Sequence, residues 1–456
     1  MQPDSLDRTD PQIPGIDDAS QPPSNRAWSL TRRGFLLAAA AGGGLMATGL
    51  AACATPAAPA WRFGPAGSAA PSPLAPAGTP EPTASAGGTA TPPPAASPSA
   101  PVDAGTIPPG WSEHDVMARS VVQRFIGNLA PALQGVYGEA VVAKLADILG
   151  AETDPPALRA KPAYMQVPQL VLNDLTAPLT PELDGDTMVF RLTVEEMEWP
   201  IDELKPPVAA LGYNGQWPGP TIRVRQGDRV RAIFTNNLKE TTSVHFHGVE
   251  FDDVFMDGVA FVTQKPFAPG ETFTYEFTAT RPGSQMYHSH HNATDQVGRG
   301  LLGAFVVDPA EPTPDDRYDR EYVWISNDTL GGFTINGHGF PAVVPLVVAQ
   351  GETIRIRFMN EGLMMHPWHS HGYRMKIVSR DGYDLGPNAF YCDTLGVNPG
   401  ERFDANIVAD RLGVWAFHCH ILTHVEGIDG MYGMVTALIV VPTKADVDAV
   451  YQALLA

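Results

Sequence analysis

The feature that most constrains this chain is an internal repeat in its second half. Gln226 and His245 are 19 residues apart, and Gln350 and His369 are also 19 residues apart. The spacing at the histidines stays constant although the loops between them differ in length. A repeat that keeps its register at particular residues predicts two homologous domains.

The pattern within each repeat predicts strands. From about residue 187, apolar and polar residues alternate over short stretches that are separated by Gly, Pro and Asn. Such alternation is typical of a β-sandwich or a barrel. We therefore expect an all-β fold with one domain at residues 186–311 and a second at residues 317–443.

Eight histidines occupy matching positions in the two domains. They form four His-x-His pairs, and residues two apart on a strand point to the same face. Imidazole is a common ligand of zinc and copper. One such pair would be explained by structure alone, but four pairs in a duplicated register indicate a metal site with four ligands from each domain. The first domain contributes His245, His247, His288 and His290, and the second contributes His369, His371, His418 and His420.

A second set of candidate ligands occurs only in the second domain. Cys419 lies between two of the histidines, and its side chain points to the opposite face of an extended strand. One Cys, two His and a weakly bound Met are the ligands of an electron-transferring blue-copper site. The candidates are His366, Cys419, His424 and Met431, and the aligned residues of the first domain are Thr242, Ser289, Thr294 and Leu301.

The thioether ligand depends on the alignment of one loop. Met431 lies 11 residues after His420, and Leu301 lies 11 residues after His290. This match favours Met431 as the axial ligand. Met434 is the rival candidate.

The first 110 residues predict export rather than a folded domain. Arg32 and Arg33 precede a short apolar run, and residues 1–53 resemble a twin-arginine signal peptide with a lipobox. Residues 54–110 are rich in Ala, Pro, Ser and Thr and have too few large apolar residues to form a core. We expect either a lipid anchor at Cys53 or ordinary cleavage nearby. The protein would then lie on the outer face of the cytoplasmic membrane of a bacterium, or be periplasmic or extracellular.

Residues 111–185 predict a helical segment followed by a connector. Met117, Val121 and Phe125 recur at helical spacing, and Pro131 separates this stretch from a second one with the same periodicity. The sequence assigns these helices no function beyond packing against the main body.

Composition narrows the range of partners. The chain has 50 acidic and 30 basic residues, a formal net charge of -20. That charge argues against nucleic acid as a partner, because binding to phosphates needs a basic surface. Three cysteines are too few for a disulfide framework, and we expect Cys392 to be a buried small apolar residue.

The combined histidine motifs resemble the four copper signatures of multicopper oxidases. They lie at residues 245–248, 287–290, 366–372 and 418–431. The resemblance covers about residues 186–443. Two domains with mononuclear ligands only in the second are similar to two-domain (small) laccases. The resemblance implies that each domain is a cupredoxin, a Greek-key β-sandwich.

The resemblance also implies four copper ions per chain. A type 1 copper would accept electrons from the substrate, and a type 2 copper with a type 3 pair would form the cluster that reduces dioxygen. The implied type 1 ligands are His366, Cys419, His424 and Met431; the type 2 ligands are His245 and His369; and the type 3 ligands are His247, His288, His290, His371, His418 and His420.

Two further residues have implied roles in the reaction. Cys419 would carry electrons to the cluster through its two flanking histidines, and Asp257 resembles the acidic residue that delivers protons to the cluster. The predicted reaction couples one-electron oxidation of phenolic, aromatic or metal-ion substrates to four-electron reduction of dioxygen to water. Members of the two-domain group are homotrimers, so we expect a homotrimer here.

Two other functions share parts of this pattern. A copper nitrite reductase also has two cupredoxin domains, but its mononuclear site lies in the first domain, where this chain has Ser289 instead of Cys. A non-enzymatic copper-binding protein would not need eight imidazoles. The chain departs from the family at Leu422 and Thr423, where relatives often carry Glu, which leaves the second proton donor open between Glu426 and Asp295.

Overall fold

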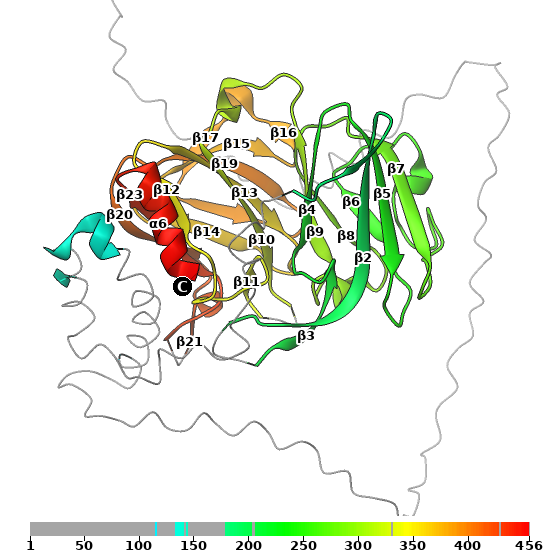
Figure 1. Ribbon diagram of the computed structural model, residues 1–456, viewed down its shortest axis with the longest axis horizontal. Coiled ribbons are helices and arrows are strands. Elements are labelled where there is room, and N and C mark those ends of the chain that lie inside the picture. Colours follow the sequence, from blue (N-terminus) through cyan, green and yellow to red (C-terminus); the bar gives the residue numbers. More distant parts are fainter. Residues whose placement is uncertain are drawn as a thin grey trace, which may run out of the picture. The chain divides into compact units, whose positions relative to one another are not determined.

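A computed structural model describes residues 115, 133–140, 143–144, 178–202, 206–329, 332–427 and 430–455. The strands form two β-sheet domains that follow each other in the chain (Figure 1). The predicted signal peptide and Pro-rich linker lie outside the described residues. The all-β class of the fold is confirmed, and the domain boundaries stay predictions.

The first domain is built from two sheets that pack face to face. One sheet has the strand order β1-β2-β5-β7 with β3 paired to β2, and the other has the order β4-β9-β8-β6. The burial of β5 alternates along its length, so that Val230, Ala232 and Phe234 enter the core. The strands are β1 (Glu182–Asp184), β2 (Thr187–Trp199), β3 (Val208–Tyr213), β4 (Gly219–Arg225), β5 (Arg229–Asn236), β6 (Val244–His247), β7 (Thr272–Thr278), β8 (Gly283–Ser289) and β9 (Leu302–Asp308).

The second domain repeats this plan with additions. Its sheets have the orders β11-β10-β13-β19-β15-β16, with β17 paired to β15, and β12-β23-β20-β14-β18. A short hairpin, β21–β22, stands apart from both sheets. The strands are β10 (Arg320–Asn327), β11 (Thr334–Ile335), β12 (Leu346–Ala349), β13 (Thr353–Asn360), β14 (His366–Ser370), β15 (Met375–Arg380), β16 (Tyr383–Asp384), β17 (Phe390–Cys392), β18 (Thr394–Val397), β19 (Arg402–Val408), β20 (Gly413–Cys419), β21 (Glu426–Gly427), β22 (Gly430–Met431) and β23 (Val435–Val441).

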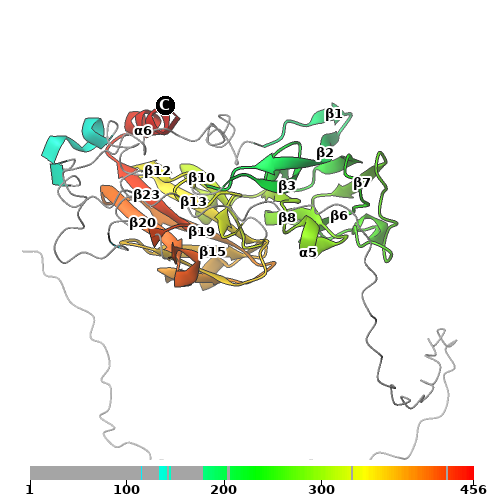
Figure 2. The same cartoon turned by 90° about the horizontal axis from the view of Figure 1, so that it is seen from below.

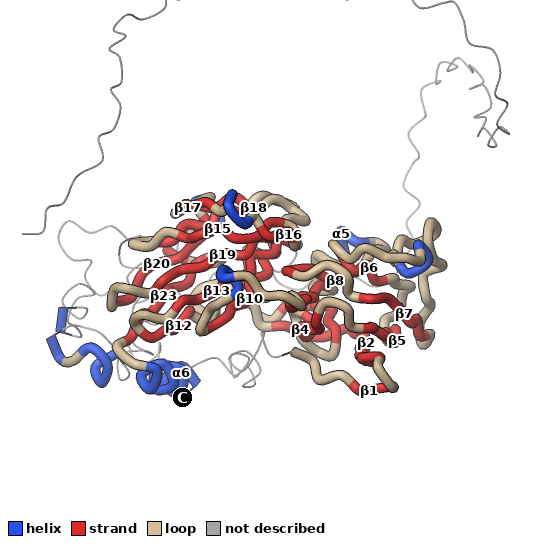
Figure 3. The backbone as a smooth tube through the Cα atoms, turned by 90° about the horizontal axis from the view of Figure 1, so that it is seen from above, coloured by secondary structure: helices blue, strands red, loops and turns tan. Residues whose placement is uncertain are grey.

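The two domains share their strand pairing as well as their sequence pattern. The parallel pair β2–β5 corresponds to the parallel pair β10–β13, and β4–β9 corresponds to β12–β23. The antiparallel pairs β6–β8 and β14–β20, which carry the histidines, also correspond. The two groups of strands can be followed from below in Figure 2 and from above in Figure 3. The repeat in the sequence is therefore a repeat of topology.

The short helical elements lie at the edges of the sheets. The C-terminal helix α6 (Lys444–Leu455) packs on β12, and described residues of the 111–185 segment are helical at 115, 133–137, 139–140 and 143–144. Within this segment Leu133 is fully buried in the core of the second domain, and the hydroxyl of Tyr137 donates to the Val440 carbonyl. No described helix is long and apolar enough to cross a membrane. The other helical turns are η3 (Val254–Met256), α5 (Ala293–Gln296), η4 (Pro314–Asp316), η5 (Gly386–Asn388) and η6 (Leu422–His424).

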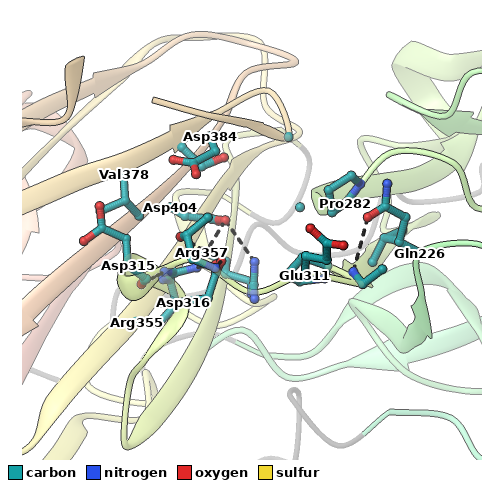
Figure 4. Close-up of a pocket in the computed structure, with 17 residues that line it drawn as sticks. Gln226, Pro282, Glu311, Asp315, Asp316, Arg355, Arg357, Val378, Asp384 and Asp404 are labelled. Atoms are coloured by element: carbon teal, nitrogen blue, oxygen red, sulfur yellow. Dashed lines mark hydrogen bonds and ion pairs between the residues drawn. The ribbon is translucent and has the colours of Figure 1, made fainter. Parts of the chain in front are cut away.

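The domains meet through buried charges as well as apolar side chains. Arg357 of β13 donates to Asp404 Oδ2 within the second domain at 2.9 Å, and to Ser284 Oγ of the first domain at 3.0 Å. Arg402 donates to Gln285 Oε1 at 2.9 Å. Arg357 and Asp404 line a cavity of about 410 Å³ between the domains, and none of the predicted copper ligands lines it (Figure 4). The cavity is part of the domain interface rather than of the candidate site.

Candidate metal centres

Three of the four predicted mononuclear ligands converge in the second domain. His366 begins β14, Cys419 ends β20 and His424 ends the turn η6. The Cys419 sulfur lies 3.8 Å from His366 Nδ1 and 3.6 Å from His424 Nδ1, and all three potential ligand atoms lie within 4.8 Å of one another. All three side chains are buried. Their atoms therefore face one point inside the domain.

The protonation of this group suits a soft metal ion. Burial raises the pKa of the Cys419 thiol to about 11 and lowers the pKa of His424 to about 4. The imidazole is thus neutral at pH 7, while the thiol holds a proton that a metal ion would displace on binding. One thiolate and two imidazoles are a donor set that copper prefers. The residues fit the metal that the sequence predicts.

The loop that carries the candidate axial methionine differs from the prediction. The amide of Cys419 donates to the Met434 carbonyl at 3.0 Å, and in the first domain the amide of Ser289 donates to the Leu301 carbonyl at 3.0 Å. Leu301 therefore corresponds to Met434, and its predicted alignment with Met431 is wrong. The physical reason is the hairpin β21–β22, which lengthens the loop of the second domain.

Burial separates the two methionines in the same way. Met431 pairs with Glu426 in the hairpin and is 39% exposed. Met434 is fully buried in the core cluster that contains Cys419, and its amide donates to the His424 carbonyl at 3.0 Å. Of the two candidate methionines, Met434 is therefore the one that is buried in the core of the domain.

The equivalent pocket of the first domain contains a hydrogen-bond network instead of ligands. The hydroxyl of Thr242 donates to Gln296 Oε1 at 2.8 Å, and the hydroxyl of Ser289 donates to the same oxygen at 2.5 Å. The Gln296 amide donates to the Thr241 carbonyl at 3.0 Å. Gln296, rather than the predicted Thr294, occupies the third ligand position, because the turn after Ser289 includes the helix α5. The positions equivalent to His366, Cys419 and His424 are thus occupied in this domain by Thr242, Ser289 and Gln296.

The four histidines of the first domain form one group, the first half-site. Strands β6 and β8 pair so that His245 lies opposite His288. The ring of His245 has its centroid 5.7 Å from that of His247 and 5.5 Å from those of His288 and His290. The sequence prediction of which four residues come together in this domain agrees with the structure.

The four histidines of the second domain form a matching group, the second half-site. Strands β14 and β20 pair so that His369 lies opposite His418. The His369 centroid lies 4.8 Å from that of His371, 5.6 Å from that of His418 and 5.5 Å from that of His420. The Nε2 atoms of His371 and His418 are 3.0 Å apart. Both nitrogens therefore face the same small volume.

Backbone carbonyls orient the same nitrogens in both half-sites. The Nδ1 atom of His288 lies 2.9 Å from the Ser289 carbonyl, and that of His418 lies 2.9 Å from the Cys419 carbonyl. Likewise His245 Nδ1 is 2.7 Å from the Asp257 carbonyl. Each Nδ1 is thus assigned as the N–H donor, which leaves Nε2 free to bind a metal.

Burial keeps two imidazoles of each half-site neutral. Burial is the main cause that lowers the pKa of His247 to about 3 and of His288 to about 4, and the Arg402 charge adds to both shifts. Burial also lowers the pKa of His371 and His418. Neutral imidazoles are the form that binds metal ions. These four histidines, two in each half-site, are therefore in the ligand-competent form at neutral pH.

The structure does not bring the two half-sites together. Among the described residues, every contact between histidine rings of the half-sites lies within one domain. The near approach of Gly400 to His247 places a loop of the second domain, not a histidine, beside the first half-site. Two separate groups of four imidazoles are therefore what a single chain presents.

Asp257 lies where the sequence predicts a residue near the cluster. It follows the turn η3 as its C-cap residue, and its Oδ1 atom is 3.4 Å from His245 Nδ1. Two histidines outside the predicted set have other surroundings. His291 Nε2 lies 2.9 Å from the Thr241 hydroxyl, and His338 is buried beside Trp199.

Two residues near the mononuclear site were not anticipated. Asp328 Oδ2 lies 3.1 Å from His366 Nε2, and the ring of Phe333 stacks on that of His424 with centroids 4.0 Å apart. Asp328 is 38 positions before His366 in the chain, and nothing in the spacing of the histidines indicates it. Its position at the end of a strand next to the ligand strand becomes evident only in the fold.

Family models match both domains. Two models, each described as multicopper oxidase, cover residues 193–312 and 313–443, more than half of the chain. The chain belongs to the multicopper oxidase family. This result agrees with the two groups of histidines and with the Cys-His ligand set.

Curated relatives include oxidases with different named substrates. The chain is 34% identical over 227 residues to the iron transport multicopper oxidase FET5 of Saccharomyces cerevisiae, which is 44% of this chain and 36% of that protein. It is 40% identical over 251 residues to an L-ascorbate oxidase of Brassica rapa subsp. pekinensis, 44% of this chain and 43% of that protein. The chain spans less than half the length of these multicopper oxidases.

The chain matches two solved structures of multicopper oxidases over most of their length. The blue copper oxidase from Nitrosomonas europaea is 31% identical with a TM-score of 0.53, over 55% of this chain and 85% of that chain. The multicopper oxidase mgLAC is 35% identical with a TM-score of 0.53, over 57% of this chain and 88% of that chain. These neighbours confirm the cupredoxin-like fold of the two domains.

Proposed function

We propose that the protein is a laccase-like multicopper oxidase, which couples one-electron oxidation of a reducing substrate to four-electron reduction of dioxygen to water. The observation that carries the proposal is the asymmetry of the two domains. Both contain four imidazoles whose rings lie close together, and only the second has a buried thiol grouped with two further imidazoles. One mononuclear set and one shared cluster are the ligand sets that this chemistry needs.

The mononuclear copper would be held by His366, Cys419 and His424. Met434 would be the axial ligand instead of Met431, because it is buried and has the backbone position of Leu301 in the other domain. Copper bound at the two sites would supply the electron transfer and the reduction of dioxygen. The chain joins the two ligand sets directly, since Cys419 is bonded to His418 and His420 of the second half-site.

The remaining histidines would hold three copper ions. His245 and His369 are at equivalent positions, with Nδ1 close to the carbonyls of Asp257 and Asp393, and would bind the type 2 ion. The other six would bind the type 3 pair. The carboxylate of Asp257, beside His245, would hold and transfer protons at the first half-site.

A second copy of the chain would complete the cluster. The half-sites of one chain are separate, and exposed apolar residues occur close to both in the chain. Phe261 is 78% exposed and its ring lies 5.8 Å from that of His291, next to His290. Tyr391 is 67% exposed and precedes Asp393, whose carbonyl contacts His369, by two residues. Exposed apolar residues of this kind mark protein interfaces. A head-to-tail ring would join the first half-site of one chain to the second half-site of the next, which would complete each cluster and cover the exposed apolar residues. We propose a homotrimer as the closed form of this ring.

Mixing two inactive variants tests this assembly. His247→Ala damages the first half-site and His371→Ala damages the second. In mixed oligomers an interface can combine an intact first half-site from one chain with an intact second half-site from the other. Co-expression is expected to restore oxygen uptake that each variant lacks alone. If each cluster formed within one chain, no mixture would regain activity.

The substrate of the proposed reaction is a phenolic or other aromatic compound, or a metal ion. Oxygen uptake in the presence of a phenolic dye, compared with a panel of reduced metal ions, tests the reaction and separates these classes. Uptake with at least one class is expected. Absence of oxygen uptake with every donor, together with reduction of nitrite, would favour a nitrite reductase and contradict the proposal.

The location of the protein is proposed from its sequence alone. A twin-arginine signal with a lipobox at Cys53 would export the chain and attach it to the outer face of the cytoplasmic membrane. Mass spectrometry of the mature N-terminus tests this. A lipid-modified Cys53 is expected, and an unmodified N-terminal residue beyond it would contradict the anchor.

A further inference from the structure

The side chain of Asp328 lies behind one ligand of the mononuclear site. It follows the last residue of β10, and its side chain has no exposed surface. Its Oδ2 atom is 3.1 Å from His366 Nε2, although the two atoms do not have the alignment of a linear hydrogen bond. The other ring nitrogen, Nδ1, faces the Cys419 sulfur. The ring of His366 therefore lies between the proposed copper position and a buried carboxylate.

The loop before His366 holds this carboxylate in place. Asp328 Oδ1 accepts from the amide of Leu363 at 2.6 Å, and Oδ2 accepts from the amide of Met364 at 2.7 Å. At Gly362 a Cβ atom would lie only 2.8 Å from the carboxylate carbon. The loop can thus wrap closely around the acid only because residue 362 has no side chain.

The residues on either side of Asp328 bind the first domain. The Asn327 amide donates to the Val297 carbonyl at 3.4 Å, and the Thr329 hydroxyl donates to the Gly298 carbonyl. The segment 327–329 is therefore fixed at both ends to the domain that lacks the mononuclear site. The carboxylate of Asp328, in the middle of this segment, is held by the second domain, which contains the mononuclear site.

The first domain has a different acidic residue at the position equivalent to Asp328. Val194 pairs with Asn236 as Ser326 pairs with Asn360, so Glu196 corresponds to Asp328. Glu196 forms a surface ion pair with Lys239 at 2.6 Å, and its side chain is 44% exposed. The fold itself therefore does not require a buried acid here. Burial of the carboxylate occurs in the domain with the Cys-His ligand set.

We propose that Asp328 is a positioning residue for the mononuclear copper. It would fix His366 with Nδ1 toward the metal, and its negative charge would favour the more positive, oxidised state of the ion. Partners of ligating histidines act in this way, because they set the orientation and the basicity of the ring. The inference rests on the proposed function, since it assumes copper at His366, Cys419 and His424.

The reduction potential of the mononuclear copper tests this role. Asp328→Asn removes the charge and keeps the size of the side chain, and Glu196→Gln makes the same charge change at the equivalent position of the first domain. D328N is expected to raise the potential by about 59 mV or more. For one electron this shift corresponds to a tenfold change in the ratio of reduced to oxidised copper. E196Q is expected to leave the potential unchanged. Equal potentials in D328N and E196Q would overturn the proposal.

A second variant acts on the same carboxylate from the opposite side. Gly362→Ala places a Cβ atom against the Asp328 carboxylate and displaces it from His366 while the charge is retained. A smaller upward shift in potential is expected. If D328N or G362A changes only the melting temperature of the protein, Asp328 has a structural role and the proposal is wrong. A wild-type protein that binds no blue copper would instead contradict the proposed function.

Discussion

The two domains contain the same pocket with different contents. In the second domain the pocket is lined by His366, Cys419 and His424, whose ligand atoms lie within 4.8 Å of one another. In the first domain Thr242 and Ser289 donate to Gln296, which satisfies every polar group that replaces a ligand. A buried polar pocket without a metal ion must be hydrogen-bonded internally to be stable. The comparison shows that the first domain has been rebuilt as a structural core, while its outer histidines still form a half-site.

The largest effect is expected from making the second pocket resemble the first. Cys419→Ser replaces the thiolate with the residue found at the equivalent position, Ser289. It is expected to abolish blue absorption and oxidase activity, because a hydroxyl is a poor copper ligand and breaks the path to the histidines. Absorption spectroscopy and oxygen uptake measure both. Ser289→Ala is the control and should keep the colour. Blue absorption or activity in C419S would refute the role of Cys419.

Both half-sites are expected to be required for oxygen uptake. His247→Ala and His371→Ala each remove one imidazole from one half-site, and neither residue is next to Cys419 in sequence. Each variant is expected to lose oxygen uptake and to retain the blue absorption of the mononuclear site. Full oxygen uptake in either variant would show that the two domains do not share one cluster.

The axial ligand provides a smaller and more selective test. Met434→Leu introduces the residue that the first domain has at Leu301, and Met431→Leu makes the same chemical change on the exposed hairpin. Loss of a thioether is expected to raise the potential of the mononuclear copper in M434L by about 59 mV or more, a tenfold change in its redox equilibrium. M431L should not differ from wild type. The reverse result would restore Met431 as the axial ligand.

The smallest effect is expected in the first pocket. Gln296→Ala leaves the hydroxyls of Thr242 and Ser289 without their shared acceptor, which should lower the free energy of unfolding by about 1–3 kcal/mol. The blue absorption should remain. Gln350→Ala in an exposed turn is the control and should change stability by less than about 0.5 kcal/mol. A change of colour in Q296A would mean that this pocket is not purely structural.

The sequence predicted the features that depend on strand register. His245 and His288 lie on adjacent strands, as do His369 and His418, and a side-chain period of two carried each His-x-His pair to one face. The all-β fold and the grouping of four histidines per domain followed from that regularity. Strand pairing preserves spacing, so equal distances in sequence became equal positions in space.

The sequence was misleading where spacing passes through loops. Eleven residues separate both His290 from Leu301 and His420 from Met431, but the hairpin β21–β22 uses part of the second interval. Met434 therefore takes the position of Leu301. Asp328 was not predicted, because the contact with His366 depends on the pairing of β10 with β13 and on the loop after β13. The separation of the two half-sites is a property of domain packing, which a linear pattern does not contain.

The copper content of the purified, copper-loaded protein tests the central claim most directly. We expect native mass spectrometry to find four copper ions per chain, one in the second pocket and three shared between half-sites of neighbouring chains. H247A should retain the single blue copper. A wild-type protein that binds only one copper per chain would contradict the account, because the eight grouped histidines would then hold no cluster.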